Sequence, residues 1–330
     1  MDFLYEEKTV KTNQEFFDAL KSGFIYTDFL AQWDSGWEQT RQYKALIAFL
    51  EPRIDESPMI AWGYAKAVLT WQDDPSCRET ARTILLSLAQ QDFAPALYTL
   101  ADRGLFGTEK SLLWMERAVE LEYGPALYDV GYQKYRKNKH PGLHFSTEYS
   151  VKPFDCDGEE EGVALLKRAY KVGIRSAAEL LAQHYAQLED ARMIEYCRGG
   201  VESCNDWCAY LLAECYRTGK FVERNDCYAA ELYEKSGQWW IEPEEYDINR
   251  SFGKLEPIFS AYFALGEMHE NNLLPDSSVE KAKHYFTLAA QNIDRYDEDL
   301  SDEDQIKIDK LYKYSAFRER EYYYDVQLPF

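Results

Sequence analysis

Residues 211–221, LLAECYRTGKF, predict a helix that packs closely against a neighbour and then ends. From Leu212 onward the stretch gives a large apolar residue, the small Ala213, then Tyr216 and Gly219. A small residue lets two helices approach closely, and the tyrosine packs one turn later. Glycine adopts the left-handed conformation that ends many helices. One such stretch carries little information, but its recurrence would indicate a repeat protein.

The same spacing returns along the chain. In residues 85–101, 114–132 and 164–185, a helix ending near a small residue precedes a tight turn and a second helix with its own small residue, and 261–266 matches in part. In chain order, these second small residues are Ala101, Gly131, Ala182, Ala213 and Gly266, separated by 30, 51, 31 and 53 residues. The two long intervals predict loops inserted between stacked hairpins near 137–159 and 237–256, since both segments are rich in turn-forming residues.

Helix signals dominate the rest of the chain. Thr12 to Glu15 has the form of a capping box, residues 41–50 suit a helix that ends before Pro52, and residues 58–71 begin with a proline at a helix start. We find no run of alternating β-branched residues flanked by Asn-Gly or Asp-Gly turns. The sequence therefore predicts an all-α fold built from helical hairpins.

The repeating pattern resembles the Sel1-like repeat family, a relative of the tetratricopeptide repeats. The best matches are Leu212 to Gly219 and the stretch 164–185, and the resemblance covers about 76–293. It implies a right-handed α-solenoid of stacked helix-turn-helix hairpins, with about five or six repeats. The match is imperfect, because Gly104 and His269 stand where the family has an aromatic residue.

This resemblance divides the chain into three parts. Residues 1–75 are expected to form an N-terminal helical cap, and residues 76–293 the repeat array with its two insertions. Residues 294–330 are expected to form a C-terminal acidic segment and a capping helix, which closes the end of the array.

The charge balance restricts the possible partners. The chain has 58 acidic and 37 basic residues, for a formal net charge of −21. Such a field repels nucleic acid and anionic membranes and attracts basic proteins, although it also serves solubility alone. The N-terminal residues lack a signal peptide, and no apolar run approaches the roughly 18 residues of a membrane span. With seven scattered cysteines, an odd number, these features predict a cytoplasmic protein.

Searches for catalytic and metal-binding patterns give little. There is no glycine-rich phosphate loop and no Gly-x-Ser-x-Gly motif, and a proline and a glycine separate His140 from His144. Cys204, Cys208 and Cys215 have the spacing of one helix stripe, which favours core packing. A zinc site or a disulfide with Cys197 is the alternative. The sequence predicts no catalytic, cofactor or metal site, and thus no enzyme.

Two segments combine acidic and aromatic residues and are the candidate partner-binding sites. Tryptophan and tyrosine beside charged groups are typical of binding hot spots. Core filling by the aromatics, and a solvated loop that caps a helix over 302–320, are the alternatives. The candidate residues are Trp239, Trp240, Glu242, Glu244, Glu245 and Tyr246 in the first segment, and Asp297, Glu298, Asp299, Asp302, Glu303 and Asp304 in the second.

These features favour a non-catalytic protein-binding scaffold. An array of helical hairpins offers an extended surface without inherent chemistry, and its acidic field would attract a basic protein partner. The resemblance implies the same role, because Sel1-like proteins mostly act as adaptors. One specific form of this hypothesis is a bacterial immunity protein that neutralises a toxin. The alternatives are a regulatory adaptor of another pathway and a hydrolase with an unrecognised site.

Overall fold

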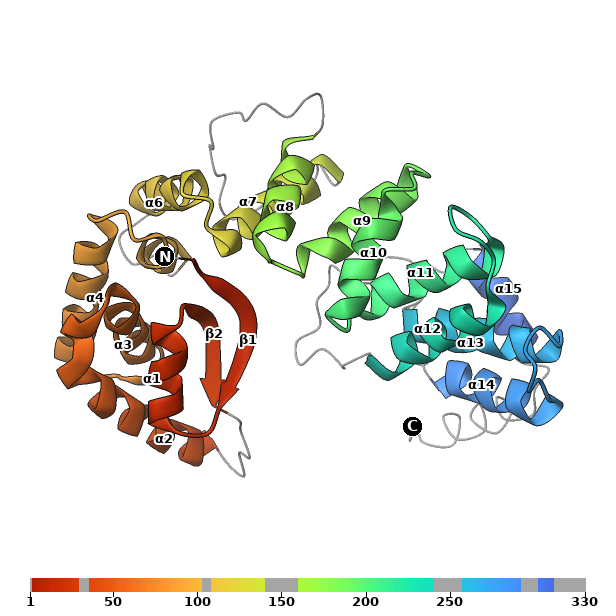
Figure 1. Ribbon diagram of the computed structural model, residues 1–330, viewed down its shortest axis with the longest axis horizontal. Helices are drawn as coiled ribbons and strands as arrows, with labels where there is room; N and C mark the ends of the chain where they lie inside the picture. The colour runs from red at the N-terminus through yellow and green to blue at the C-terminus, as the bar shows by residue number, and fades with distance from the viewer. Residues whose placement is uncertain are drawn as a thin grey trace, which may run out of the picture. The chain divides into compact units, whose positions relative to one another are not determined.

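The protein consists of two compact units in a computed structural model. Contacts between residues separate Met1–Ala177, which we call unit 1, from Ala178–Phe330, which we call unit 2. Each unit is built mainly from consecutive helices (Figure 1). The residues that the structure describes are 2–29, 36–102, 108–139, 160–239, 257–291 and 302–311.

Unit 1 begins with a β-α-β motif that the sequence analysis did not predict. Strands β1 (Leu4–Val10) and β2 (Phe24–Phe29) pair in parallel, and helix α1 (Asn13–Lys21) connects them. The N-terminal segment expected to be a helical cap therefore contains a two-stranded sheet. β1 lacks the usual signal, because its centre is an exposed Glu-Glu-Lys run without apolar alternation.

The predicted capping box starts α1. The Thr12 hydroxyl accepts a hydrogen bond from the Glu15 backbone N–H at 3.2 Å. The Glu15 carboxylate accepts one from the Lys11 N–H at 2.7 Å, so two donors at the helix start are satisfied. Phe16 and Leu20 are buried on the inner face of this helix. Since α1 contacts β2 on one side and α3 on the other, it joins the sheet to the helix array (Figure 1).

The next helices begin and end where the sequence predicts. α2 (Gly36–Leu50) stops before Pro52 and continues into a 3-10 turn, η1 (Glu51–Glu56). α3 (Pro58–Trp71) starts with a proline after Ser57, whose hydroxyl accepts a hydrogen bond from the Ile60 N–H at 3.2 Å. α1 packs tightly on α3, because a Cβ built at Gly63 would lie 2.3 Å from Leu20 Cδ1.

From α3 onward, the described residues form six consecutive helix pairs. Unit 1 contains α3 with α4 (Pro75–Ala89), α5 (Ala94–Asp102) with α6 (Thr108–Glu120), and α7 (Gly124–Lys139) with α8 (Glu161–Val172). Unit 2 contains α9 (Ala177–Gln187) with α10 (Met193–Glu202), α11 (Asp206–Thr218) with α12 (Asp226–Trp239), and α13 (Pro257–Glu270) with α14 (Val279–Gln291). A further helix, α15 (Asp302–Leu311), follows. The predicted array of five or six hairpins is confirmed.

The small residues lie where two helices touch, as predicted. A Cβ at Gly131 of α7 would lie 3.0 Å from Leu165 Cβ of α8, and one at Gly266 of α13 would lie 2.6 Å from the Phe286 ring of α14. Ala213 of α11 is fully buried. Gly219 ends α11 with a φ of +76°, and its N–H bonds to the last turn.

The two predicted insertions follow α7 and α12, so the second lies between two helix pairs as predicted, whereas the first lies inside the pair of α7 and α8. Residues 137–139 end α7 and residues 237–239 end α12, and the remainder of both insertions lies outside the described residues. Among the helices of the described ranges, none is both long enough and apolar enough to cross a membrane.

Candidate functional site

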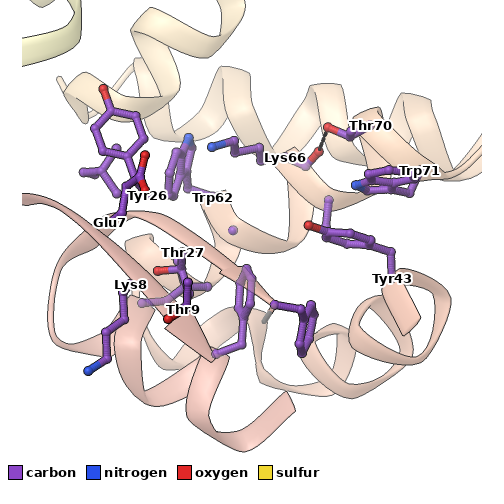
Figure 2. Close-up of a pocket in the computed structure, with 16 residues that line it drawn as sticks. Glu7, Lys8, Thr9, Tyr26, Thr27, Tyr43, Trp62, Lys66, Thr70 and Trp71 are labelled. Atoms are coloured by element: carbon purple, nitrogen blue, oxygen red, sulfur yellow. Dashed lines mark hydrogen bonds between the residues drawn. The ribbon is translucent and has the colours of Figure 1, made fainter. Parts of the chain in front are cut away.

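A pocket of about 460 Å³ lies in unit 1 between the two-stranded sheet and α3 (Figure 2). The strands contribute polar side chains such as Glu7, Lys8 and Thr27. α3 contributes Trp62 and Lys66, and the Lys66 side chain points toward Trp62 (Figure 2). The pocket exists because α1 connects the strands while it packs on α3, which holds the sheet beside this helix.

Aromatic rings form one end of the pocket. Tyr43 of α2 stacks on Trp71 of α3 with a centroid distance of 4.4 Å and an interplanar angle of 11°. Phe29 of β2 meets the Tyr43 ring edge-on at 5.8 Å and stacks on Phe16 at 5.4 Å. These rings come from four different elements, so their mutual packing fixes the wall in place. The wall suits a large apolar group.

Trp62 and Lys66 form the side of the pocket that α3 contributes. The two residues are one helical turn apart, and the Lys66 ammonium lies 5.1 Å from the Trp62 ring centroid, within cation–π distance. The indole N–H of Trp62 donates a hydrogen bond to the Thr99 hydroxyl of α5 at 3.0 Å. This bond fixes the indole orientation, because the tryptophan is only 2% exposed.

A second hydrogen bond of the same kind joins α5 to α7. The Tyr98 hydroxyl donates to Asp129 Oδ2 at 2.6 Å. Burial raises the pKa of Asp129 to about 6, against the lowering effect of the Tyr98 hydrogen bond. Burial, and secondarily the Asp129 charge, raises the pKa of the nearby Tyr26 to about 12. A chain of side-chain contacts therefore runs along the first helices of successive pairs, from α3 to α7.

The start of the chain lies against this row of helices. Phe3 contacts the rings of Phe93 and Tyr123 at centroid distances of 6.0 and 5.6 Å. Tyr5 contacts Tyr123 at 6.0 Å, and its hydroxyl accepts a hydrogen bond from the Gly124 N–H at 3.2 Å. The first turns of α5 and α7 thus hold an extended segment that carries alternating aromatic side chains.

Unit 2 has a side-chain network of its own between α11 and α12. Arg217 donates to Glu214 Oε2 at 2.7 Å and to the Tyr233 hydroxyl at 3.1 Å. The Tyr233 hydroxyl in turn donates to Glu214. Burial and the Glu214 charge raise the pKa of Tyr233 above its ordinary range. This network joins α11 to α12 inside one helix pair.

Most of the predicted partner-binding residues lie outside the described part of the chain. Trp239 is the last residue of α12 and is half-buried. Asp302, Glu303 and Asp304 form the first turn of α15, where their side chains lie outside the described residues. The positions outside the described ranges are Trp240, Glu242, Glu244, Glu245, Tyr246, Asp297, Glu298 and Asp299. Their role in binding stays a prediction.

The predicted stripe of buried cysteines on one helix is confirmed for Cys208 and Cys215 and is wrong for Cys204. Cys208 and Cys215 are buried in α11, and Cys197 of α10 is buried as well. Cys204 is exposed and lies in the turn before α11 with a φ of +59°, so the helix begins too late to include it. In the described ranges, no group of three His, Cys, Asp or Glu side chains has the geometry to hold a metal ion.

Two of the histidines are buried in the core, as two of the stripe cysteines are. His184 and His269 are buried inside the helix pairs, whereas His140 and His144 lie outside the described residues. The His269 ring stacks on Tyr285 at 5.4 Å. Burial lowers the pKa of His269, which favours its neutral form.

Sequence reasoning missed the pocket. Its walls come from residues 7–9, 16–29 and 43–71, for which the sequence predicts a helical cap. One signal was available: β2 reads FIYTDF, which is rich in β-branched and aromatic residues. The pairing of this segment with β1 requires a contact between distant residues, which periodicity within one segment does not reveal.

Comparison with solved structures finds Sel1-like repeat proteins. A protective antigen present in uropathogenic Escherichia coli strains, which displays an SLR fold, matches with a TM-score of 0.51 and 15% identity, over 94% of this chain and 70% of its own. A Sel1 repeat protein from Oxalobacter formigenes matches with a TM-score of 0.46 and 18% identity, over 76% of this chain and 93% of its own. A putative sel1 repeat protein from Klebsiella pneumoniae subsp. pneumoniae matches with a TM-score of 0.32 and 16% identity, over 71% of this chain and 99% of its own.

No family model and no curated protein matches the sequence. The likeness to the E. coli antigen shows the fold, which is that of a Sel1-like repeat solenoid. At 15% identity it shows the fold alone.

Proposed function

We propose that this protein is a non-catalytic scaffold that binds a basic protein, and that its pocket beside α3 receives a large apolar side chain of that partner. The observation that supports this proposal is the pocket itself. Its walls are aromatic rings held in place by one another, and its rim is polar. An apolar anchor in a preformed aromatic pocket is the usual arrangement at the energetic centre of a protein interface.

The preference for a basic partner comes from the charge. The chain carries 21 more acidic than basic residues, which speeds the encounter with a positively charged surface and disfavours acidic competitors. The pocket carries both Lys8 and Lys66 as well as Glu7. The anchor at the pocket is therefore expected to be uncharged, with the partner's basic groups bound elsewhere.

The acidic and aromatic segments around Trp239 and Asp302 remain part of this proposal as the sites for those basic groups. A cytoplasmic location fits the free cysteines of the described residues. In the narrower form of the hypothesis, the partner is a toxin and the protein confers immunity. Co-expression with a basic toxin of the same organism tests this form, since immunity requires that the cells survive.

A blocking substitution tests the pocket. Thr70 is exposed, lines the pocket and bonds to the backbone of its own helix, so Thr70→Trp would fill the cavity without removing a core contact. Thr83 of α4 is also exposed and makes the same kind of backbone bond, but does not line the pocket. Thr83→Trp is therefore the matched control.

The assay is affinity capture with the purified chain as bait, washed at low and then at high salt. We expect a stoichiometric basic protein on the wild-type bait, at least tenfold less of it on Thr70→Trp, and an unchanged amount on Thr83→Trp. Failure to retain any basic protein at moderate salt would contradict the scaffold proposal. Equal retention by both tryptophan variants would contradict the role of the pocket.

A further inference from the structure

Unit 2 contains a built site for an ammonium group, and a lysine of the same chain occupies it. The Lys310 ammonium of α15 lies 3.1 Å from Glu267 Oε1 and 2.7 Å from Glu270 Oε2. It also lies 5.6 Å from the ring centroid of Phe263 and 5.2 Å from that of Phe286. Two carboxylates and two aromatic rings thus surround one cation, which combines charge-assisted hydrogen bonds with cation–π attraction.

The walls of this socket, which we define as Phe263, Glu267, Glu270 and Phe286, belong to the last helix pair. Phe263 and Phe286 are 4% and 1% exposed, and their rings meet at 5.5 Å. Phe286 is held against Gly266, where no side chain fits. The close approach of α13 and α14 therefore holds the aromatic walls in place, and the socket is part of the repeat array itself.

The occupant is held by far fewer contacts. Within the described side chains of α15, Ile308 and Leu311 are buried, whereas Ile306 is 69% exposed. A helix of ten residues is not stable alone in water, so its position depends on these anchors and on Lys310. Its exchange for another segment with the same chemistry requires the release of Leu311 from the buried core that includes Phe259 and Phe286, together with the release of Ile308 and Lys310.

The socket selects for a cation. Burial favours the neutral amine, but the hydrogen bonds to Glu270 and Glu267 more than offset it and raise the pKa of Lys310 above its ordinary value. A neutral side chain in the same place would lose both ion pairs and both cation–π contacts. Selection for a charged amine is what a receptor for a basic protein requires.

We propose that this socket recognises a lysine of the partner protein, flanked by aliphatic residues as Lys310 is flanked by Ile308 and Leu311. α15 covers the socket until the partner displaces it. This inference rests on the proposed function and adds the chemistry of the recognised residue. Because α15 competes for the site, removal of its lysine is expected to raise the affinity for a lysine-bearing segment.

The test uses a peptide copy of α15, Asp302–Leu311, blocked at both ends and labelled with a fluorophore. We expect it to bind the full chain carrying Lys310→Ala at least tenfold more tightly than the wild-type chain. A peptide that carries Lys310→Gln is expected to bind that variant at least fivefold more weakly. Glu267→Gln, added to the Lys310→Ala chain, is expected to cause a similar loss for the lysine peptide.

Two results would overturn the inference: equal binding of the two peptides, or equal binding of the lysine peptide by wild type and Lys310→Ala. Circular dichroism and melting of each variant show whether it is folded, and Lys310→Gln replaces Lys310→Ala if the alanine variant is not. A capture experiment with a Glu267→Gln, Glu270→Gln bait separates the two proposals. Undiminished capture by this bait refutes the socket and leaves the scaffold standing, whereas no capture by the wild type refutes the scaffold.

Discussion

The two units place different chemistry at two neighbouring positions on one face of the first helix of each pair. The first helix of each pair carries a small residue, and the residues three before and one after it lie one turn apart on the same helix face. In unit 1 the earlier position is Trp62 or Tyr98, whose polar end donates a hydrogen bond to the next first helix. In unit 2 the later position is Glu214 or Glu267, and an arginine or lysine holds each carboxylate.

The charge follows the same division. Residues 1–177 contain 27 acidic and 21 basic residues, whereas residues 178–330 contain 31 and 16. Sequence repetition thus places side chains at equivalent positions, while the identity of each side chain decides what the position binds. Unit 1 has a pocket with aromatic walls and a rim of mixed charge, whereas in unit 2 carboxylates hold an arginine and a lysine. A partner that uses both would need an apolar anchor and exposed basic residues.

The largest change in stability is expected at the close helix crossings, which both units share. Ala101 of α5 and Ala213 of α11 are small residues at buried helix crossings. Ala101→Trp and Ala213→Trp should each lower the free energy of unfolding by about 3 kcal/mol or more, because neither crossing has room for an indole. Urea denaturation measures the change, with Leu188→Trp at a 57% exposed site as the control. Wild-type stability of Ala213→Trp would show that α11 is wrongly aligned with the other repeats.

A smaller loss is expected when the hydrogen bond between α3 and α5 is broken. Thr99→Val keeps the side-chain shape but leaves the buried Trp62 N–H without its acceptor, which should cost about 1 to 3 kcal/mol. Thr218→Val is the control, since this exposed helical threonine bonds only to its own backbone and a neighbouring N–H. Adding Trp62→Phe should make the effect of Thr99→Val much smaller. If Thr99→Val costs the same in both backgrounds, the bond contributes nothing.

These two predictions differ in how far the sequence foretold them. Close packing at Ala213 and Gly266 could be predicted from the sequence, because it depends on the size of residues that lie a few positions apart. The bond between Trp62 and Thr99 depends on how two helices are placed, and no periodicity encodes it. The same holds for the pocket, for β1 and for Lys310, each of which depends on contacts between distant segments. Cys204 shows that prediction from local spacing also has a limit. The spacing of the three cysteines does not reveal that α11 begins only after Cys204.

Two half-buried carboxylates, Asp129 of unit 1 and Glu214 of unit 2, should respond to neutralisation with opposite signs. Burial raises the folded-state pKa of Asp129 from 3.8 to about 6, so between these values the native state binds more protons than the unfolded state. Its contribution to stability is therefore full below about pH 4 and is lost as the pH rises toward 6. Asp129→Asn retains an acceptor for Tyr98 and should raise the unfolding free energy at pH 8 by about 2 kcal/mol.

Glu214→Gln should lower the unfolding free energy at pH 8 by about 1 to 2 kcal/mol, since Arg217 would lose its charged partner. Urea denaturation of both variants at pH 4 and pH 8 measures the two effects. The Asp129→Asn gain should disappear at pH 4. A gain that persists at pH 4, or a loss from Asp129→Asn at pH 8, would contradict the assignment of Asp129 as a carboxylate destabilised by burial.

The smallest expected effect concerns the rate at which a basic partner associates. Neutralising Asp302, Glu303 and Asp304 should slow association a few-fold at low salt, because unit 2 carries most of the acidic excess that would steer the partner. The fold should survive, since charges in the first turn of a helix contribute only about 0.3 to 1 kcal/mol each. Stopped-flow or biosensor kinetics at 50 mM and 300 mM salt would measure the rate. The control neutralises Asp55, Asp73 and Glu109, which are exposed acids of unit 1, and should slow association less. Equal slowing by the two triple variants would mean that the total charge of the chain steers the partner. The difference in chemistry between the two units would then affect recognition after contact and not the rate of encounter.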